Sequence, residues 1–370
     1  MRVLILSCNT GQGHNSCAKA LQEVFLAKGA HCEIVDALGF VSAGFSRLIS
    51  AGHVRMYRYF PKVFSLSYHY SELHPTLFAE EAKVYRVLSL GTARLAHFLR
   101  QGNYDVILCV HVFSALMVTD VMRKSPLPSR SYFVATDYTC SPSTEESVLD
   151  GYFIPSKRLA DDFCKGTITA GKILPVGIPV RQEFYRHEAV DVAKDAFAVA
   201  PGHKHLVVMT GSMGCGPVVS VSKRIAKGLA DDQEMTIVCG TNKRLNRRLT
   251  RYFARSPRIH VRGYEKNVSL LLDSADLFLT KPGGISVTEA ATKRVPMVLM
   301  DAVAGCETYN CRYYLMAGGA ITEKNRRRLA AETLALLADG ERCERMAAAL
   351  ALACSGNAAE AVYAECVRKK

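Results

Sequence analysis

The stretch Leu277-Phe-Leu-Thr-Lys-Pro-Gly-Gly-Ile-Ser-Val-Thr-Glu289 runs from an apolar strand through two glycines into a helix. Gly283 and Gly284 carry no side chain that would hold a ligand away from the backbone. The helix that begins there directs unpaired N–H groups and the positive end of its dipole at whatever binds. Glu289 lies one turn further along, where a carboxylate can accept hydrogen bonds from ribose hydroxyls. The stretch therefore predicts a nucleotide site, although an ordinary strand-to-helix turn fits the same residues.

Two further glycine turns follow apolar strands elsewhere in the chain. Asn9-Thr-Gly-Gln-Gly13 follows the first strand, and Gly211-Ser-Met-Gly-Cys-Gly216 follows a strand in the second half. Ligands in open α/β sheets bind beyond the carboxyl ends of the strands. We therefore expect all three turns, with Gly211 and Ser212 among them, to line a cleft between two domains. The GxGxxG and GxxxxGK[ST] spacings of dinucleotide folds and P-loop NTPases are missing from all three turns.

Strands and helices alternate along the chain in the pattern of an α/β fold. We expect strands near residues 2–8, 31–36, 104–110, 130–135 and 150–154, and then near 205–210, 235–239, 258–262, 275–280 and 296–300. We expect helices near residues 15–28, 77–100, 113–124 and 157–165, and then near 217–230, 242–254, 266–273, 284–293 and 308–317. This alternation predicts two parallel sheets with right-handed crossovers.

The length of 370 residues and the hydrophobic content of 49% suffice for two ordinary cores. Two prolines and a glycine in Pro175-Val-Gly-Ile-Pro-Val180 mark the joint between domains. We therefore predict an N-terminal domain at residues 1–178 and a C-terminal domain at residues 179–355. A C-terminal helix within residues 356–370 would be able to return to the first domain.

Composition indicates a cytoplasmic protein with reduced thiols. No stretch approaches the roughly 20 apolar residues that span a bilayer, and the strand that follows Met1 leaves no room for a signal peptide. The 13 cysteines are scattered and form no CxxC pair. Structural thiols are therefore favoured over disulfides or a zinc site.

The net charge of +13 is concentrated locally, and no acidic residue occurs between Asp36 and Glu72. The cationic and aromatic residues of this segment that we single out are Arg47, Arg55, Tyr57, Arg58, Tyr59, Phe60 and Lys62. Arginines that meet lipid head groups beside rings that settle at the interface are typical of contact with an anionic membrane. Single-stranded nucleic acid would suit the same composition, and so would a core that simply buries the rings.

A second basic run falls largely on one face of a predicted helix. It comprises Lys243, Arg244, Arg247, Arg248, Arg251, Arg255 and Arg258. Spacings of three and four place most of these side chains together. We interpret this face as solvated, with membrane contact as the minority alternative.

The motifs together resemble glycosyltransferase family 28. Those that carry the resemblance are Thr10-Gly-Gln-Gly-His14, Val134-Ala-Thr-Asp-Tyr138, Asp150-Gly-Tyr-Phe-Ile-Pro-Ser156, Gly177-Ile-Pro-Val180, Thr280-Lys-Pro-Gly-Gly-Ile-Ser-Val-Thr-Glu-Ala290, Pro296-Met-Val-Leu299 and Gly305-Cys-Glu-Thr-Tyr-Asn310. Within that family they are most similar to the diacylglycerol glycosyltransferases, namely monogalactosyldiacylglycerol synthase and the processive glucosyl enzymes. The resemblance covers roughly residues 1–320.

The resemblance implies a GT-B fold of two Rossmann-like domains and a hexose transfer from a UDP-sugar to diacylglycerol. The domain at residues 1–178 would face the acceptor and the membrane, and the domain at residues 179–355 would bind the UDP-sugar. The transfer would invert the anomeric centre, need no metal or cofactor, and take place at the inner face of the membrane. The partners would be a UDP-hexose, a lipid acceptor and an anionic membrane surface, and no nucleic acid is expected. The product would be a glycolipid.

The resemblance also assigns roles to individual residues. Gly283 and Gly284 would hold the diphosphate, and Glu289 would hold the uridine ribose. The backbone of Tyr264 would meet uracil. The residues expected near the donor sugar are Glu307 and Asn310. The family usually has glutamine at the position of Cys306, and a thiol hydrogen-bonds sugar hydroxyls poorly, so the resemblance leaves the hexose open.

Displacement at a sugar carbon needs a base for the acceptor hydroxyl and positive groups for the leaving diphosphate. The helix after the two glycines, with Lys281 or the Gly211 loop, meets the second need without a divalent cation. His14 stands on a glycine turn and titrates near neutral pH, which makes it the first candidate for the base. Asp137 is the second candidate or the group that orients His14, and His111 is the third. Ordinary capping roles fit the same positions.

Two alternatives remain at this point. The nearer is another enzyme of the same fold, either a lipid-linked N-acetylglucosaminyltransferase or a UDP-sugar epimerase. The more distant is a non-enzymatic protein that binds nucleotide or RNA through its positive charge.

Overall fold

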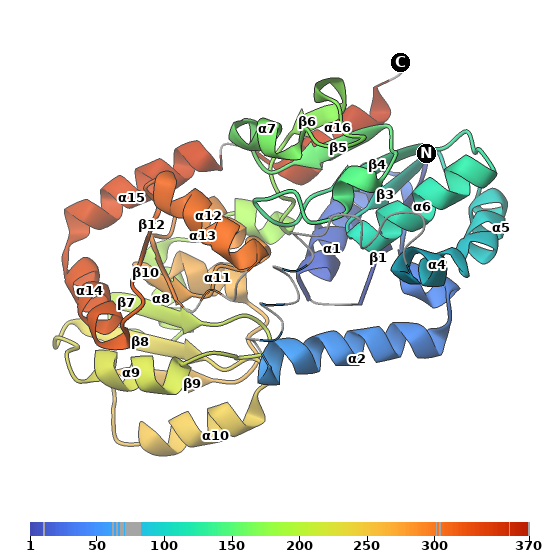
Figure 1. The fold of residues 1–370 in the computed structure, drawn as a ribbon. Coiled ribbons are helices and arrows are strands. Elements are labelled where there is room, and N and C mark those ends of the chain that lie inside the picture. The colour runs from blue at the N-terminus through green and yellow to red at the C-terminus, as the bar shows by residue number, and fades with distance from the viewer. Residues whose placement is uncertain are drawn as a thin grey trace. The chain divides into compact units, whose positions relative to one another are not determined.

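The computed structural model describes residues 1–9, 12–60, 63, 66, 70, 83–300, 302, 305–354 and 356–368. They fall into two compact units (Figure 1). The first holds the described residues of Met1–Gln182, Val303–Tyr309 and Gly356–Lys370, and the second holds those of Glu183–Ala302 and Asn310–Ser355. Each unit contains one parallel sheet, which confirms the predicted α/β fold.

The first unit has six strands in the order β2-β1-β3-β4-β5-β6. They are β1 (Arg2–Ser7), β2 (His31–Asp36), β3 (Val106–Cys109), β4 (Arg130–Val134), β5 (Gly151–Ile154) and β6 (Ile173–Pro175). Its helices are α1 (Gln12–Ala27), α2 (Ala43–Tyr59), α4 (Lys83–Ser89), α5 (Thr92–Gly102), α6 (Val112–Lys124), α7 (Ala160–Phe163) and α16 (Ala358–Val367). Its short 3-10 helices are η1 (Ala37–Phe40), η3 (Thr144–Glu146), η4 (Lys157–Leu159) and η5 (Ala170–Lys172), and η6 (Gln182–Tyr185) begins at the last residue of this unit and continues into the second.

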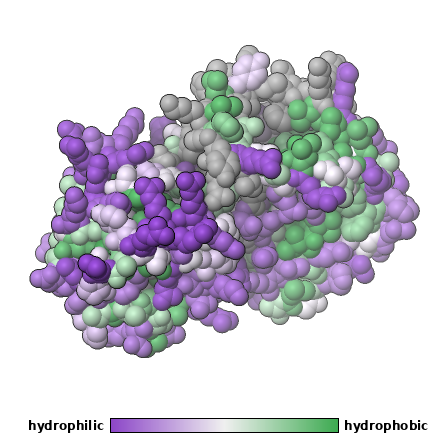
Figure 2. Space-filling model, turned by 90° about the horizontal axis from the view of Figure 1, so that it is seen from below, coloured by the Kyte–Doolittle hydropathy of each residue, from purple (hydrophilic) through white to green (hydrophobic). Residues whose placement is uncertain are grey.

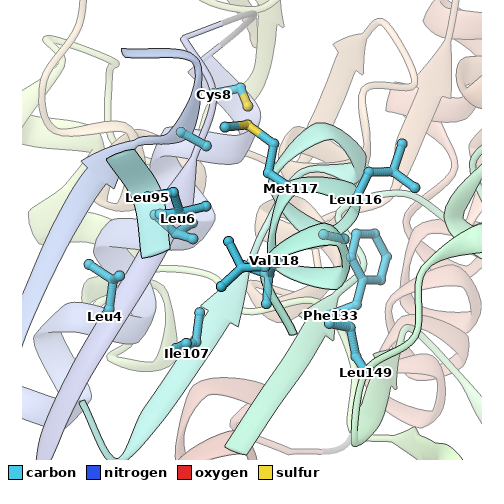
Figure 3. Close-up of a cluster of buried hydrophobic side chains, with 14 of the residues drawn as sticks. Leu4, Leu6, Cys8, Leu95, Ile107, Leu116, Met117, Val118, Phe133 and Leu149 are labelled. Carbon is cyan, nitrogen blue, oxygen red and sulfur yellow. The ribbon is translucent and has the colours of Figure 1, made fainter. Parts of the chain in front are cut away.

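The core of the first unit forms because both faces of its central strands are apolar. Leu4 and Leu6 of β1, Ile107 of β3 and Phe133 of β4 project from the sheet among the α6 side chains, including Val118 (Figure 3). Near-continuous apolar runs are typical of parallel strands that helices cover on both faces. This packing fixes the carboxyl ends of β1, β3 and β4 beside one another.

The second unit has six strands in the order β12-β11-β10-β7-β8-β9. They are β7 (Lys204–Met209), β8 (Gln233–Val238), β9 (Ile259–Arg262), β10 (Leu277–Thr280), β11 (Met297–Leu299) and β12 (Ala320–Thr322). Its helices are α8 (Val190–Ala196), α9 (Val218–Ala226), α10 (Lys243–Tyr252), α11 (Val268–Asp273), α12 (Gly284–Thr292), α14 (Arg326–Ala338) and α15 (Gly340–Ala353). The residues of α13 (Cys306–Met316) are shared between the two units.

Both sheets have a point where the strand order reverses. In the first unit it lies between β1 and β3, and in the second it lies between β7 and β10. Open α/β sheets bind ligands beyond the carboxyl ends of the strands at such a reversal. Of the three predicted glycine turns, the first follows β1, and the other two follow the neighbouring strands β7 and β10.

Three expectations about the elements were wrong. The single helix expected at residues 77–100 is two helices in its described part, α4 and α5, because Gly91 packs against backbone. A Cβ on Gly91 would lie 3.0 Å from the carbonyl carbon of Phe40. Each sheet has six strands rather than five. Helix α2 was not expected, although the Ser42 side chain caps it by accepting from Phe45 N.

The C-terminal helix α16 packs on α1 within the first unit. The rings of Phe25 and Tyr363 lie 5.3 Å apart, and Lys28 Nζ lies 3.2 Å from Glu360 Oε2. The first residue of the second unit is Glu183, whereas the expected boundary lay after residue 178. None of the described helices is long and apolar enough to cross a membrane.

Candidate active site

His14 lies where the strand order of the first sheet reverses, in the first turn of α1. Its Nδ1 donates to the backbone oxygen of Val110 at 2.8 Å, directly after β3. Thr136 Oγ1 lies 3.1 Å from the same nitrogen. Because a carbonyl can only accept, the proton of neutral His14 is on Nδ1 and the lone pair is on Nε2. Burial lowers the pKa of His14 from its ordinary value, so the imidazole is held in the form that can accept a proton.

His111 lies beside His14 but uses its ring differently. The two rings meet edge to face with their centroids 4.6 Å apart. His111 caps α6, and its Nδ1 accepts from the backbone N–H of Phe113 at 3.1 Å. The lone pair of neutral His111 is therefore already engaged. This geometry favours His14 over His111 as a proton acceptor.

Asp137 follows β4 and is half-buried beside Cys306. Burial first, and then the carboxylates of Asp137 and Glu307, raise the pKa of the Cys306 thiol well above its ordinary value. The thiol is therefore protonated and can donate to a carboxylate. Glu307 is itself buried. The structure thus gathers Asp137, Cys306 and Glu307, while orientation of His14 by Asp137 stays a prediction.

The Gly211 loop is interlocked with the turn that follows β8. Ser212 O accepts from Thr241 N at 2.8 Å. Gly214 and Gly240 both have φ of 56°. Each packs against the backbone of the other turn. A Cβ on Gly214 would lie 2.1 Å from Cys239 O, and one on Gly240 would lie 2.2 Å from Ser212 O. The loop at the end of β7 is therefore fixed by backbone contacts that exclude side chains.

Asn242 ties this loop to α10. Its side-chain nitrogen donates to Gly214 O at 3.0 Å, and its side-chain oxygen accepts from Leu245 N at 3.0 Å. The second contact is the N-cap of α10. The same amide therefore holds both the Gly211 loop and the first turn of a helix.

The glycine turn after β10 opens α12 as predicted. Gly283 is the N-cap residue, with φ of −70° and no side-chain cap. The first turn of α12 has no acidic residue, so its N–H groups and helix dipole favour an anion. Asn310 is fully buried, and its side-chain nitrogen donates to Pro282 O at 3.0 Å. Lys281, also buried, comes directly before this turn.

The other expected donor residues lie at the same edge of the second sheet. Glu289 is half-buried on α12, and Tyr264 is 61% exposed in the loop after β9. Neighbouring Arg262 and Glu265 form an ion pair at 3.3 Å in that loop. The roles of Glu289 and Tyr264 in holding uridine stay predictions.

The residues expected at the membrane lie on or after α2. Arg47, Arg55 and Phe60 are exposed. Tyr57, Arg58 and Tyr59 are in the last turn of α2, and their side chains lie outside the described part. Lys62 lies outside the described residues altogether.

Sequence reasoning missed several groups that the structure brings to these turns. Thr136 and the carbonyl of Val110 position His14. Gly240 and Asn242 hold the Gly211 loop. Thr210 directly follows β7 and is 4% exposed, and its hydroxyl has no hydrogen-bond partner within the described part of the chain. The signal that could have found Gly240 and Asn242 is the Gly-Thr-Asn run directly after a strand and before a helix.

The geometry at Gly283 makes a substitution informative. Its φ suits any residue, and a Cβ there would have no protein atom within 4 Å. We expect Gly283→Ala to lower the free energy of unfolding by no more than about 1 kcal/mol, because alanine is a poorer N-cap residue than glycine but meets no steric conflict here. Its affinity for UDP should fall by roughly tenfold, because the methyl group would occupy the approach to the α12 amides. Calorimetry with UDP and a melting curve measure both quantities.

Gly211→Ala is the matched contrast. Gly211 has φ of 69°, so alanine there is strained and should lower the melting temperature as well as UDP affinity. Unchanged UDP affinity in Gly283→Ala would remove this turn from the ligand site.

Comparison with known proteins identifies the class. The family model of monogalactosyldiacylglycerol (MGDG) synthase matches residues 14–180. A processive diacylglycerol beta-glucosyltransferase of Bacillus cereus (strain AH187) is 26% identical over 359 residues, which cover 94% of this chain and 89% of that relative.

Solved structures share the fold. MurG of Acinetobacter baumannii matches with a TM-score of 0.67 and 12% identity over 98% of both chains. UDP-GlcNAc 2-epimerase of Neisseria meningitidis, bound to UDP-GlcNAc, matches with a TM-score of 0.64 and 12% identity over 99% of both chains. At these identities the likeness shows the fold alone.

The fold and these matches together define a glycosyltransferase of the GT-B type. The chain is similar to the monogalactosyldiacylglycerol (MGDG) synthase family model and to processive diacylglycerol beta-glucosyltransferases, which confirms the resemblance that its motifs carry.

Proposed function

We propose that this glycosyltransferase transfers a hexose from a UDP-sugar to diacylglycerol at the inner face of the membrane and so makes glycolipid. The observation that carries the proposal is the match over 94% of the chain to a processive diacylglycerol beta-glucosyltransferase. The geometry of the two sheets supports it, since each sheet holds one half of the required chemistry. Inversion at the anomeric carbon follows from a single displacement.

The acceptor half is the His14 group. A base that removes the hydroxyl proton of a neutral lipid must be unprotonated at neutral pH and must present its lone pair. His14 meets both conditions through the Val110 carbonyl and its lowered pKa. Asp137 is the alternative base or a group that stabilises protonated His14.

The donor half is formed by the turns after β7 and β10. UDP leaves with added negative charge, which the α12 N-terminus, Lys281 and the Gly211 loop would stabilise. A buried Thr210 hydroxyl without a partner among the described residues is a further donor at this edge. These groups supply the stabilisation that a divalent cation gives in other transferases, and the proposal is therefore metal-independent transfer. Activity that survives a chelator would support it.

The hexose is glucose or galactose in this proposal. Glu307 and Asn310 lie on α13 with Cys306, the position at which the resemblance leads us to expect glutamine. The side-chain nitrogen of Asn310 donates to Pro282 O, and the carboxylate of Glu307 is of the kind that accepts hydrogen bonds from sugar hydroxyls. UDP-glucose, UDP-galactose and UDP-N-acetylglucosamine should be compared as donors with the same acceptor.

The proposed function is tested by UDP release from each donor with and without diacylglycerol vesicles. Acceptor-dependent release with UDP-glucose or UDP-galactose, together with a glycolipid product, would support it. Release only with UDP-N-acetylglucosamine and a polyprenyl-linked acceptor would replace it with the N-acetylglucosaminyltransferase alternative. Salt-sensitive RNA binding without turnover would replace it with a binding function.

The surface of α2 suits peripheral attachment. Leu48 is 69% exposed and Phe60 is 61% exposed, near exposed Arg47 and Arg55. Apolar side chains that enter the interface beside cations that meet anionic head groups are typical of interfacial helices. The green residues on the right of Figure 2, on the side of the first unit, show apolar surface on this view of the molecule.

The attachment predicts a charge-dependent result. Arg47→Glu with Arg55→Glu should weaken cosedimentation with anionic vesicles at least tenfold, because each cation near such a surface contributes about 1 kcal/mol. UDP affinity should not change. The control is Lys157→Glu with Arg158→Glu, which alters two exposed cations of the same unit by the same charge. Equal loss in both variants would show that net charge, rather than α2, decides attachment.

A further inference from the structure

Helix α10 presents a basic face that the proposed chemistry does not use. Its exposed cations are Lys243, Arg244, Arg247, Arg248 and Arg251. At about 100° per residue these five side chains fall within an arc of about 140°. The deep purple residues on the left of Figure 2, over the second unit, show how strongly hydrophilic this side of the molecule is.

No carboxylate neutralises this face within the described part of the chain. The segment from Met235 to Tyr264 contains no acidic residue. Among the described residues, the ion pairs of this segment join Arg258 to Asp231, Arg262 to Glu265 and, when its ring is protonated, His260 to Glu234, and none of them involves a cation of α10. The charge of the face is therefore uncompensated, which costs self-repulsion unless an anionic partner approaches.

The opposite side of α10 is anchored in the core. Leu245, Leu249 and Phe253 are buried and lie about 130° to 170° from the centre of the basic arc by the same helical spacing. Tyr252 borders the arc, and Lys223 Nζ of α9 lies 3.4 Å from the centroid of its ring. The basic face is thus a rigid, convex surface and not a solvated arm.

We infer that the basic face of α10 is a second docking surface for anionic lipid head groups, carried by the unit that holds the glycine turns after β7 and β10. The choice of a membrane rests on the proposed function, which places the acceptor in a bilayer. Charge complementarity supports it, because exposed cations gathered on one side of a helix are attracted to a surface of anionic head groups. Single-stranded nucleic acid would also need stacking platforms, and the ring of Tyr252 is already occupied by Lys223.

The test compares two charge reversals in the same unit. Arg247→Glu, Arg248→Glu and Arg251→Glu together alter the α10 face. Arg326→Glu, Arg327→Glu and Arg328→Glu alter three exposed arginines in the first turn of α14 by the same total charge. Acidic residues at a helix N-terminus are favourable, so the control should fold.

Binding is measured with vesicles of phosphatidylcholine containing phosphatidylglycerol and with pure phosphatidylcholine vesicles. The α10 variant should lose on the order of a hundredfold in its partition coefficient for the anionic vesicles, from about a factor of five per cation removed. The α14 variant should stay within about twofold of the parent. Raising the salt concentration should weaken the parent on anionic vesicles and should change the α10 variant less.

Three results would overturn the inference. One is an α10 variant that binds anionic vesicles like the parent, and another is an α14 variant that loses as much. In the third, both variants bind vesicles with equal affinity, and only the α10 variant loses RNA binding. Hexose transfer to detergent-dispersed diacylglycerol is assayed separately. Its absence in the parent would defeat the proposed function, whereas its presence in a vesicle-binding α10 variant would defeat only this inference.

Discussion

Replacement of His14 by alanine is expected to lower kcat by roughly a hundredfold or more while the Kd for UDP stays nearly unchanged. The reason is that His14 Nδ1 is fixed by the Val110 carbonyl, which leaves Nε2 as the proton acceptor. Steady-state kinetics with the lipid acceptor and calorimetry with UDP measure the two quantities. Retention of most of the turnover would transfer the role of base to Asp137.

The pH dependence gives an independent test of the same base. Burial lowers the pKa of His14 below 6.5, its ordinary value. The neutral form therefore persists as the pH falls, and kcat of the parent should decline only below about pH 6.5. The matched control is His111→Asn, which keeps a side-chain acceptor for the α6 cap. It should retain most of kcat, because the Nδ1 lone pair of His111 is already used by Phe113 N–H.

Replacement of Glu289 by alanine is expected to weaken UDP-sugar binding by about 1–3 kcal/mol, because the ribose hydroxyls would lose a charged acceptor. Alanine is the best helix former, and Glu289 is a half-buried helix residue, so the fold should be retained. Calorimetry with UDP and with free phosphate measures the effect. Phosphate binding should not change, since the carboxylate serves the sugar.

Glu289→Gln separates charge from shape at this position. The amide keeps an acceptor oxygen of the same length and should retain part of the affinity. Equal UDP affinity in Glu289→Ala and the parent would remove Glu289 from the donor site.

The sequence was sufficient for the parallel sheets and for the position of the donor turns. Strands such as Leu277–Thr280 are short apolar runs bounded by a turn signal, and a glycine pair after such a strand has few other uses. The points of reversal follow from the order of the strands in each sheet. The hydrophobic pattern of the sequence does not predict that order. The sequence could therefore indicate which strands end in glycine turns but not which strands lie side by side.

The partners of His14 could not be predicted, for a physical reason. Its hydrogen bond goes to a backbone carbonyl 96 residues away, and every residue carries such a carbonyl. Thr136 lies 122 residues from it. The sequence therefore named the imidazole but could not assign its tautomer, which depends on the contact with Val110.

Helix α2 was missed because its composition was interpreted as a surface rather than as a structure. Arginines and aromatic rings without carboxylates indicated an interface, and the same residues have adequate helix propensity. The side chain of Ser42, which accepts from Phe45 N, was the local signal for its start. The composition of this segment thus indicated what its surface contacts, whereas the Ser42 cap indicated where its helix begins.

The interlocked glycines Gly214 and Gly240 bear on how this protein can vary. Any larger residue at either position would place its Cβ against a backbone oxygen of the opposite turn. A second substitution cannot remove a backbone oxygen. Neither position has an available compensating change, so the two turns can diverge in side chains only while both glycines are kept. A random mutant library should therefore yield active members with varied Met213 and Cys215 but with both glycines intact. The combination of Gly214 and Gly240 should therefore identify this loop in other sequences better than a run of consecutive residues does.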